Sequence, residues 1–323
     1  MLVKKAVTLY FGVRPVGFRN AIRLYISFTA SMALRILTPS RFRPISFLLI
    51  PGKSRLTIST RGIFAYVIPG TDTLAALSGV FEPNTIRWFK TGPGEVVVDI
   101  GAHIGRYTLV GAKNAAKVVA VEPNLANFSL LEENIRLNGF TNVIALPLAL
   151  SDKPGKRRFY LASGADTATS SLEPTWKLDP RKHRSSIDAS CETLDRVTDF
   201  LRLDKIDWLK IDVEGHEVSV LKGGLDTLKK TKRLILEVAE GNEEACLKII
   251  RDSGFELASV DQRKKEDGVL TTSNWLVLRR ETTIHSTTLK DETGFLKVQK
   301  IDNQSRDEEG FDYLLNILEF GRA

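Results

Sequence analysis

Cysteine is nearly absent from this 323-residue sequence, which has Cys191 and Cys246 and no C-x-x-C pair. This scarcity excludes a disulfide framework and a four-ligand zinc site built on cysteines. Such a chain is expected in the reducing cytoplasm. With 43% hydrophobic and 26% charged residues, the composition is that of a globular protein and excludes a disordered or collagen-like chain.

Acidic residues are missing from the first part of the chain. Residues 1–71 contain eleven Lys or Arg and no Asp or Glu, and the first acid is Asp72. Removing these eleven charges from the net charge of +7 leaves −4 for residues 72–323. The basic character therefore belongs to an extension, and the high average charge does not predict nucleic-acid binding by the main body.

Long apolar runs are also lacking. Residues 20–38 form a helix-length apolar stretch, but Arg23 and Arg35 leave eleven uncharged residues between them, and a membrane span needs about 20. No small-residue cleavage pattern follows, which argues against a secretory signal. Two interpretations stay open: a helix packed on the body with solvated arginines, or an interfacial helix bound peripherally to anionic lipid at the cytoplasmic membrane face. Contact of this helix with nucleic acid is a third and weaker one.

From about residue 91 onward, short apolar strands alternate with helices, which predicts a doubly wound α/β sheet with ligands at the carboxyl ends of its strands. We expect an antiparallel strand at 275–278, because only a short link precedes it. The stretch 163–190 predicts a loop or small insertion. The other expected strands are 96–100, 118–121, 143–146, 208–213, 234–238 and 255–260, and the expected helices are 105–114, 126–137, 218–229 and 243–252.

Three parts follow from these patterns. Residues 1–70 are expected to form a basic, apolar extension with a helix, and residues 71–280 the catalytic domain. Residues 281–323 are expected to form an acidic tail with a short apolar helix at 311–320.

The first strand and turn carry the sharpest chemical signal. Asp99 lies two residues before Gly101, and Gly105 follows in a G-x-x-x-G spacing rather than G-x-G-x-x-G. A carboxylate at this position would repel a pyrophosphate, whereas it suits a ligand that bears an ammonium and a sulfonium group. S-adenosyl-L-methionine is such a ligand. The alternative is a structural turn in which Asp99 caps the next helix.

Two further positions complete the expected cofactor site. Glu122 ends the second strand, 23 residues after Asp99, close to the spacing of about 20 expected for an acid that binds ribose hydroxyls. A surface glutamate before a proline turn is the alternative. After the third strand, residues 149–152, beginning with Ala149, are expected against the adenine, although small residues there also suit plain packing.

The fourth strand ends in a dense polar cluster of Lys210, Asp212, Glu214, His216 and Glu217. Its place at the carboxyl end of a central strand predicts contact with the transferred group. Lys210, Asp212 and Glu214 would share one face if the strand extends that far. An ion-pair network around Lys210 is the structural alternative.

The order of these motifs resembles the FkbM family of S-adenosylmethionine-dependent methyltransferases. The resemblance covers about residues 71–279 and rests on VVVDIGAHIG, AVEPNLANFSLLEENIRLNG, LALSDKPG, ETLD and DWLKIDVEGHEVSVLKGG. It implies a Rossmann-like seven-stranded sheet with an antiparallel last strand, and O-methylation of sugars, polyketide-type hydroxyls or other small or lipid-linked acceptors. It also implies that Asp99, Gly101 and Gly105 form the cofactor loop and that Glu122 binds the ribose. His103 departs from the asparagine usual in the family, but still offers a donor to the cofactor's methionine end.

A sugar hydroxyl is a poor nucleophile, so we expect a general base that contributes roughly 10²–10⁴-fold. Asp212 is the first candidate and His216 the second, while Glu214 would orient Lys210 or the acceptor. Asp212 and Glu237 could hold magnesium, but the sequence identifies no third ligand, and we expect no metal.

The expected acceptor is a sugar, a glycan or a lipid-linked small molecule, and no nucleic-acid partner is expected. Two alternatives remain open: an RNA-directed methyltransferase and a cofactor-binding, membrane-associated scaffold. The sequence around Asp212 lacks the Asn/Asp-Pro-Pro-aromatic stretch typical of base-directed enzymes, which disfavours the RNA alternative.

Overall fold

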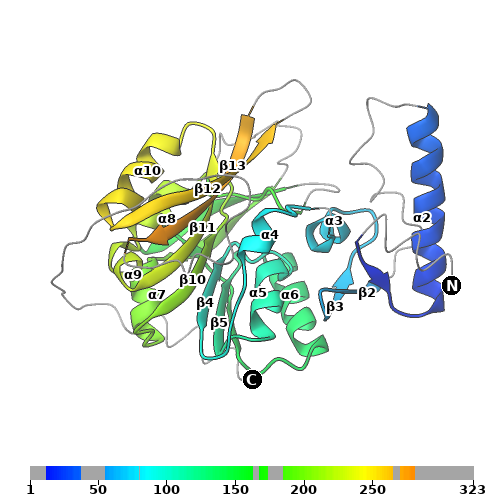
Figure 1. Cartoon of the computed structure of the whole chain (residues 1–323), viewed down its shortest axis with the longest axis horizontal. Coiled ribbons are helices and arrows are strands. Elements are labelled where there is room, and N and C mark those ends of the chain that lie inside the picture. Colours follow the sequence, from blue (N-terminus) through cyan, green and yellow to red (C-terminus); the bar gives the residue numbers. More distant parts are fainter. Residues whose placement is uncertain are drawn as a thin grey trace.

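The computed structural model describes residues 12–37, 55–79, 81–162, 167–173, 185–264 and 270–280. The predicted acidic tail and its helix at 311–320 lie outside these residues. At the centre is a seven-stranded sheet in the order β12-β13-β11-β10-β4-β5-β6 (Figure 1). Its strands are β4 (Val96–Ile100), β5 (Lys117–Val121), β6 (Val143–Leu146), β10 (Ile206–Ile211), β11 (Thr231–Ala239), β12 (Phe255–Lys264) and β13 (Leu270–Arg279).

The sheet confirms the predicted Rossmann-like fold. Strands β11, β10, β4, β5 and β6 are parallel to one another, and β13 runs antiparallel between β11 and β12. From β4, the next strands along the chain, β5 and β6, are added on one side; β10 then pairs with the other side of β4, and β11 follows it. The order in which strands are added therefore reverses between β4 and β10, which is where ligands bind in such sheets.

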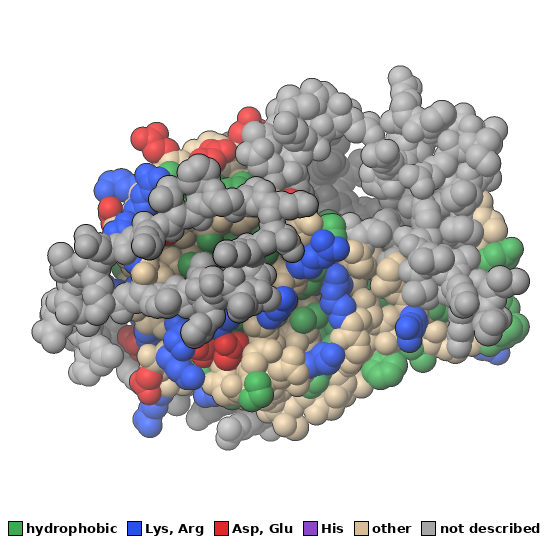
Figure 2. Space-filling view, viewed as in Figure 1, with side chains coloured by type: hydrophobic (Ala, Val, Ile, Leu, Met, Phe, Trp, Pro, Cys, Tyr) green, Lys and Arg blue, Asp and Glu red, His purple; other side chains and the backbone are tan. Residues whose placement is uncertain are grey.

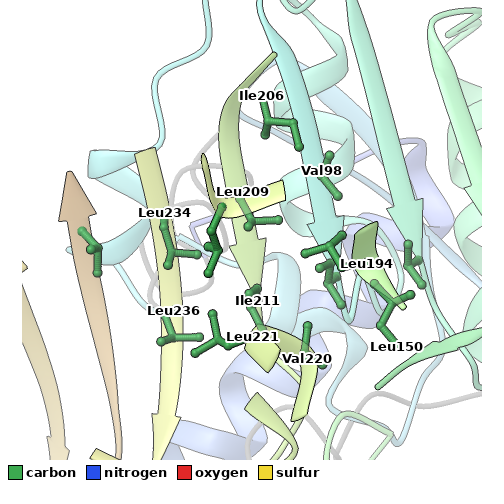
Figure 3. Packing of buried hydrophobic residues seen from close by; sticks show 14 of the residues in the cluster. Val98, Leu150, Leu194, Ile206, Leu209, Ile211, Val220, Leu221, Leu234 and Leu236 are labelled. Atoms are coloured by element: carbon green, nitrogen blue, oxygen red, sulfur yellow. The ribbon is translucent and has the colours of Figure 1, made fainter. Parts of the chain in front are cut away.

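Both faces of the sheet are covered by helices, because its central strands are apolar on both sides. One face packs against α4 (Thr85–Trp88), α5 (Arg106–Ala112) and α6 (Leu125–Leu137). The other packs against α7 (Leu194–Phe200), α8 (Glu217–Lys222), α9 (Leu225–Lys229) and α10 (Glu243–Asp252). Figure 3 shows this second layer, in which Leu209 and Ile211 of β10 meet Val220 and Leu221 of α8. This packing fixes the position of the strand that carries the polar cluster.

The predicted helix at 218–229 is wrong in one respect: the chain forms two helices, α8 and α9, separated by Gly223 and Gly224. A Cβ on Gly223 would lie 2.1 Å from the carbonyl oxygen of Ser151, so the chain approaches another loop too closely for a side chain. Asp195 Oδ1 then accepts a 2.6 Å hydrogen bond from the Thr227 amide in the first turn of α9. A new helix start is thereby stabilised from outside the segment.

A small sheet and a helix precede the catalytic body. Strands β1 (Arg14–Pro15), β2 (Leu56–Thr60) and β3 (Ile63–Val67) are antiparallel, and helix α2 (Phe18–Leu37) confirms the helix predicted near residues 20–38. The sheet was not predicted. It is fixed to α6, because the amides of Phe64 and Tyr66 donate to the side-chain oxygens of Asn138 and Asn134 at 2.8 and 2.7 Å. Within the described residues, no helix has the length and apolarity needed to cross a bilayer.

A second small sheet lies near the site. Strand β8 (Gly155–Leu161) pairs antiparallel with β9 (Ser185–Glu192), which pairs in parallel with β7 (Ala149–Leu150). The start of β9 falls inside the stretch expected to be irregular. Of that stretch, residues 167–173 are also described, and they lie across the carboxyl edge of the central sheet, as detailed below.

Candidate active site

The loop after β4 and the turn after β10 touch at the point where the sheet changes direction. Gly101 has φ +75°, and its amide donates a 2.9 Å hydrogen bond to the carbonyl of Val121. A Cβ on Gly101 would lie 1.7 Å from the carbonyl oxygen of Asp212. Glycine is therefore required for both the left-handed backbone and the close approach. This contact joins the predicted cofactor loop to the predicted catalytic turn.

Asp99 lies beneath this loop and is turned toward α5. Its side chain is 1% exposed, and its Oδ2 accepts a 2.5 Å hydrogen bond from the Thr108 hydroxyl. Burial raises the pKa of Asp99 to about 6, while the bond to Thr108 and the charge of Lys210 oppose that rise. Gly105 follows at φ +104° and begins α5. The predicted loop residues are thus together, with Asp99 as a buried support.

Glu122, at the end of β5, faces the same loop. One carboxylate oxygen accepts a 2.8 Å hydrogen bond from the His103 amide, and the other accepts one of 2.9 Å from the Asn124 amide. Burial raises the pKa of Glu122 to about 7. An ionised carboxylate offers about four acceptor positions, so Glu122 keeps acceptor capacity for ribose hydroxyls. The predicted proximity of Glu122 to the β4 loop is therefore present in the structure.

A segment that the sequence did not single out crosses this edge of the sheet. In residues 167–173, which we call the crossing segment, Thr167 donates a 2.5 Å hydrogen bond to Asp72 and lies 2.7 Å from Nε2 of His103. Farther along, the Ser171 hydroxyl donates to the carbonyl of Glu214 at 2.8 Å. The crossing segment thus connects the β4 loop to the turn after β10. Its Ser and Thr content is the only signal in the sequence, and it resembles that of any polar loop.

Three carboxylates converge beside this turn. Asp212, Glu214 and Glu237 each place an oxygen within 4.8 Å of the others. Strand β10 ends at Ile211, so the alternation expected through Glu214 does not apply; instead, Glu214 at φ +52° and Gly215 at φ +104° turn the chain back. Glu214 supplies the third carboxylate oxygen that the sequence did not identify. Such a group can hold a divalent cation or share a proton.

The charged side chains of this group differ in their exposure to solvent. Lys210 is 1% exposed, and its Nζ lies 3.1 Å from Oδ2 of Asp212, whose side chain is 26% exposed. Burial, followed by the charges of Asp212 and Glu214, raises the pKa of Glu237 well above its usual value. Glu237 therefore favours the protonated form, while Asp212 is the carboxylate paired with an ammonium and reachable from solvent.

His216 is held on both sides of its ring. Its Nε2 lies 2.9 Å from the Ser151 hydroxyl, and its Nδ1 lies 2.6 Å from a carboxylate oxygen of Glu173. The side chain is 5% exposed. Ala149, the predicted adenine contact, is buried in β7 two residues before Ser151 and pairs with Cys191. His216 thus connects the loop after β7 to the crossing segment.

Comparison with known proteins identifies the family of the chain. Residues 99–268 match the family model described as the methyltransferase FkbM domain. The chain belongs to the FkbM methyltransferase family. The predicted enzyme class, the family and the use of S-adenosylmethionine are thereby confirmed, and the scaffold without activity is not supported.

Individual FkbM relatives match in part. The chain is 28% identical over 182 residues to the hexuronic acid methyltransferase AglP of Haloferax volcanii, covering 54% of this chain and 70% of AglP. It is 30% identical over 207 residues to the AMB antimetabolite synthetase AmbE of Pseudomonas aeruginosa, covering 51% of this chain and 10% of AmbE. A crystal structure of an FkbM methyltransferase from Methylobacillus flagellatus gives a TM-score of 0.41 at 13% identity, covering 85% of this chain and 57% of that one.

The residues of this FkbM site fit S-adenosylmethionine. Carboxylates end both strands next to the loop, Asp99 in β4 and Glu122 after β5. Glu122 faces the loop and keeps acceptor positions for ribose hydroxyls, and carboxyl groups at these two positions disfavour a pyrophosphate.

Proposed function

We propose that this FkbM methyltransferase methylates a hydroxyl group of a sugar, a glycan or a lipid-linked small acceptor, with Asp212 as the general base. The observation that carries the proposal is the position of Asp212. Its backbone carbonyl stands against Gly101 of the glycine loop, and its carboxylate is 26% exposed and lies 3.1 Å from the buried ammonium of Lys210. Asp212 thus combines backbone contact with the cofactor loop, access for an acceptor and an ammonium group beside its carboxylate.

The neighbouring groups are less suited to accept the proton. Glu237 is 4% exposed, and burial together with the charge of Asp212 raises its pKa well above the usual value, which makes its carboxyl less available as a base. His216 is 5% exposed and uses both ring nitrogens on protein groups. We therefore assign His216 a positioning role and Asp212 the catalytic one. Glu214 shares the edge with Asp212 and would orient the acceptor.

The cofactor would be held by the loop from Gly101 to Gly105, by Glu122 at the ribose and by the region of Ala149 at the adenine. When bound, it supplies an electrophilic methyl group. The protein then has to align the acceptor oxygen and remove its proton. The ammonium of Lys210 lies 3.1 Å from the carboxylate of Asp212, and Asp99 supports the loop from below through Thr108.

The acceptor class is supported by the relative AglP, which is named a hexuronic acid methyltransferase. The basic, acid-free first 71 residues support contact with anionic lipid at the cytoplasmic membrane face. A lipid-linked glycan would satisfy both. Within this proposal, no metal and no nucleic acid are required.

A screen with radiolabelled S-adenosylmethionine tests the acceptor. Lipid-linked, glycan and RNA fractions of the source cell are incubated with the wild type and with Asp212→Asn. We expect label in a glycan or lipid-linked fraction, and a loss of roughly 10²–10⁴-fold in turnover for Asp212→Asn because the base is removed. Calorimetry should give nearly unchanged cofactor affinity, since Asn keeps the backbone contact with Gly101.

Three results would contradict the proposal. Label in RNA alone would assign a nucleic-acid acceptor. Label released by mild base would indicate a methyl ester, formed from a carboxylate that needs no general base. Full turnover by Asp212→Asn, together with loss in the matched variant Glu214→Gln, would move the base to Glu214.

A further inference from the structure

Helix α2 exposes apolar side chains on the face that points away from the protein. Phe18 is 80% exposed, Ile22 42%, Tyr25 41% and Ile26 46%. At 100° per residue these four positions fall within an arc of about 100° on the helix. We call them the outer stripe. Figure 1 places α2 at the right-hand edge of the molecule, and Figure 2 shows hydrophobic side chains along that edge.

The opposite face of α2 already has its partners. Leu24 and Ser27 are fully buried, and Leu24 packs in the apolar cluster of the small sheet. The start of α2 is fixed by Asn20, whose side chain donates to the carbonyl of Val16 at 2.7 Å and to that of Thr57 in β2 at 3.4 Å. The outer stripe is thus not a misplaced core face, because the helix is held by its other side.

A polar side chain on the side of α2 that carries the outer stripe already has hydrogen-bond partners. Thr29, on the same side of α2, directs its hydroxyl to the helix carbonyls of Ile26 and Tyr25 at 3.0 and 3.2 Å. This back-bonding satisfies the hydroxyl within the helix. A face of this kind tolerates transfer into an apolar environment.

The basic residues around α2 indicate which kind of apolar environment the outer stripe would contact. Arg19 is exposed on α2 next to the outer stripe, Arg14 is exposed in β1, and the first 71 residues contain eleven basic and no acidic residues. Each such cation near an anionic membrane contributes about 1 kcal/mol to binding. A second copy of this basic segment would be repelled, whereas an anionic lipid surface is complementary to it.

We propose that the outer stripe of α2 inserts into an anionic lipid surface, with the helix lying in the plane of the membrane. The inference rests on the membrane contact in the proposed function and names the surface that makes it. It does not depend on the identity of the methyl acceptor. The apolar side chains supply the insertion, and the arginines supply the preference for anionic lipid.

Vesicle flotation with the full chain tests this inference. The test variant is Phe18→Ser/Ile22→Ser/Ile26→Ser, and the matched control is Leu225→Ser/Leu257→Ser/Val260→Ser, whose positions are exposed by 46%, 38% and 40%. With vesicles of phosphatidylcholine and about 30% phosphatidylserine, the wild type and the control should bind. The test variant should bind on the order of tenfold or more weakly, because apolar burial is lost.

Further measurements separate the outcomes. Binding of the wild type should fall on pure phosphatidylcholine and in high salt. Equal binding by the test variant and the wild type would overturn the inference. So would a wild-type dimer in light scattering that the test variant converts to monomer, since the stripe would then bind a second copy. Cofactor affinity and label transfer to a water-soluble acceptor should stay unchanged in the test variant, so a failure of the proposed methyl chemistry would be visible separately.

Discussion

Replacing Gly101 by alanine should damage the site far more than a typical surface mutation. The new Cβ would lie 1.7 Å from the carbonyl oxygen of Asp212, whereas real Cβ contacts are not shorter than 3.0 Å. The loop after β4 and the turn after β10 would therefore have to separate by about 1.3 Å, and a shift of about 1 Å at a reacting group costs roughly 100-fold in rate. Alanine at φ +75° adds about 1–2 kcal/mol of backbone strain.

Gly94 provides a matched control. It has φ +77°, and a Cβ there would meet nothing within 4 Å, so Gly94→Ala carries the backbone strain without the clash. In urea unfolding we expect a loss of about 1–2 kcal/mol for Gly94→Ala and about 2–5 kcal/mol for Gly101→Ala, which adds an overpacking cost. Calorimetry should show weakened S-adenosylmethionine binding for Gly101→Ala alone.

Equal unfolding free energies and equal cofactor affinities of the two variants would refute the contact between the two loops. If Gly101→Ala and Gly94→Ala lose the same unfolding free energy and keep the same cofactor affinity, the β4 loop does not lie against Asp212. The assignment of Asp212 as the base next to the cofactor would then lose its structural support.

Three further predictions concern neighbouring groups. Asp72→Ala removes the acceptor of the Thr167 hydroxyl and of the amides of Thr167 and Ala168, so hydrogen exchange in the crossing segment should accelerate; unchanged exchange would contradict this anchoring. Because burial raises the pKa of Glu122 to about 7, its carboxyl is protonated below that pH and accepts poorly; cofactor affinity should therefore rise from about pH 6 to 8, and calorimetry on Glu122→Gln should show a flat profile. Chelation by EDTA should leave label transfer unchanged, since the ammonium of Lys210 already lies beside Asp212, whereas loss of transfer restored by magnesium would assign a cation to this group.

Much of the catalytic sheet could be predicted from the sequence. The strand at 96–100 and the helix at 243–252 have the predicted bounds in β4 and α10. Their signals are local: a continuous apolar run for a strand buried on both faces, and a periodic helix between turn residues. The predicted order of cofactor loop, ribose acid and strand-four acids also places Gly101, Glu122 and Asp212 at one edge of the sheet.

Other features depend on contacts between distant parts of the chain. The break between α8 and α9 follows from the approach of Gly223 to Ser151 and from Asp195, 32 residues before the amide of Thr227 that it accepts. The crossing segment is held by Asp72, 95 residues away. No local sequence pattern predicts hydrogen bonds between residues this far apart in the chain.

The small N-terminal sheet illustrates the same limit. Its strand β1 has two residues, and β2 and β3 have five each, so their periodicity is too brief to stand out beside an apolar helix. The third carboxylate, Glu214, was visible in the sequence, but its convergence with Glu237 depends on two successive residues with positive φ, Glu214 and Gly215. Glutamate rarely adopts that conformation, so the sequence favoured a straight strand instead.

The shared core of the small sheet and the catalytic body has a thermodynamic consequence. Leu24 of α2 and Ile63 of β3 belong to one apolar cluster with Ala102 and Ile104 of the cofactor loop. Unfolding of the extension would therefore expose the underside of that loop. A ligand or membrane that binds α2 only in its native form therefore stabilises the folded state, and it raises the melting temperature of the whole methyltransferase. Binding of α2 to a membrane would thus increase the stability of the folded enzyme at the membrane surface.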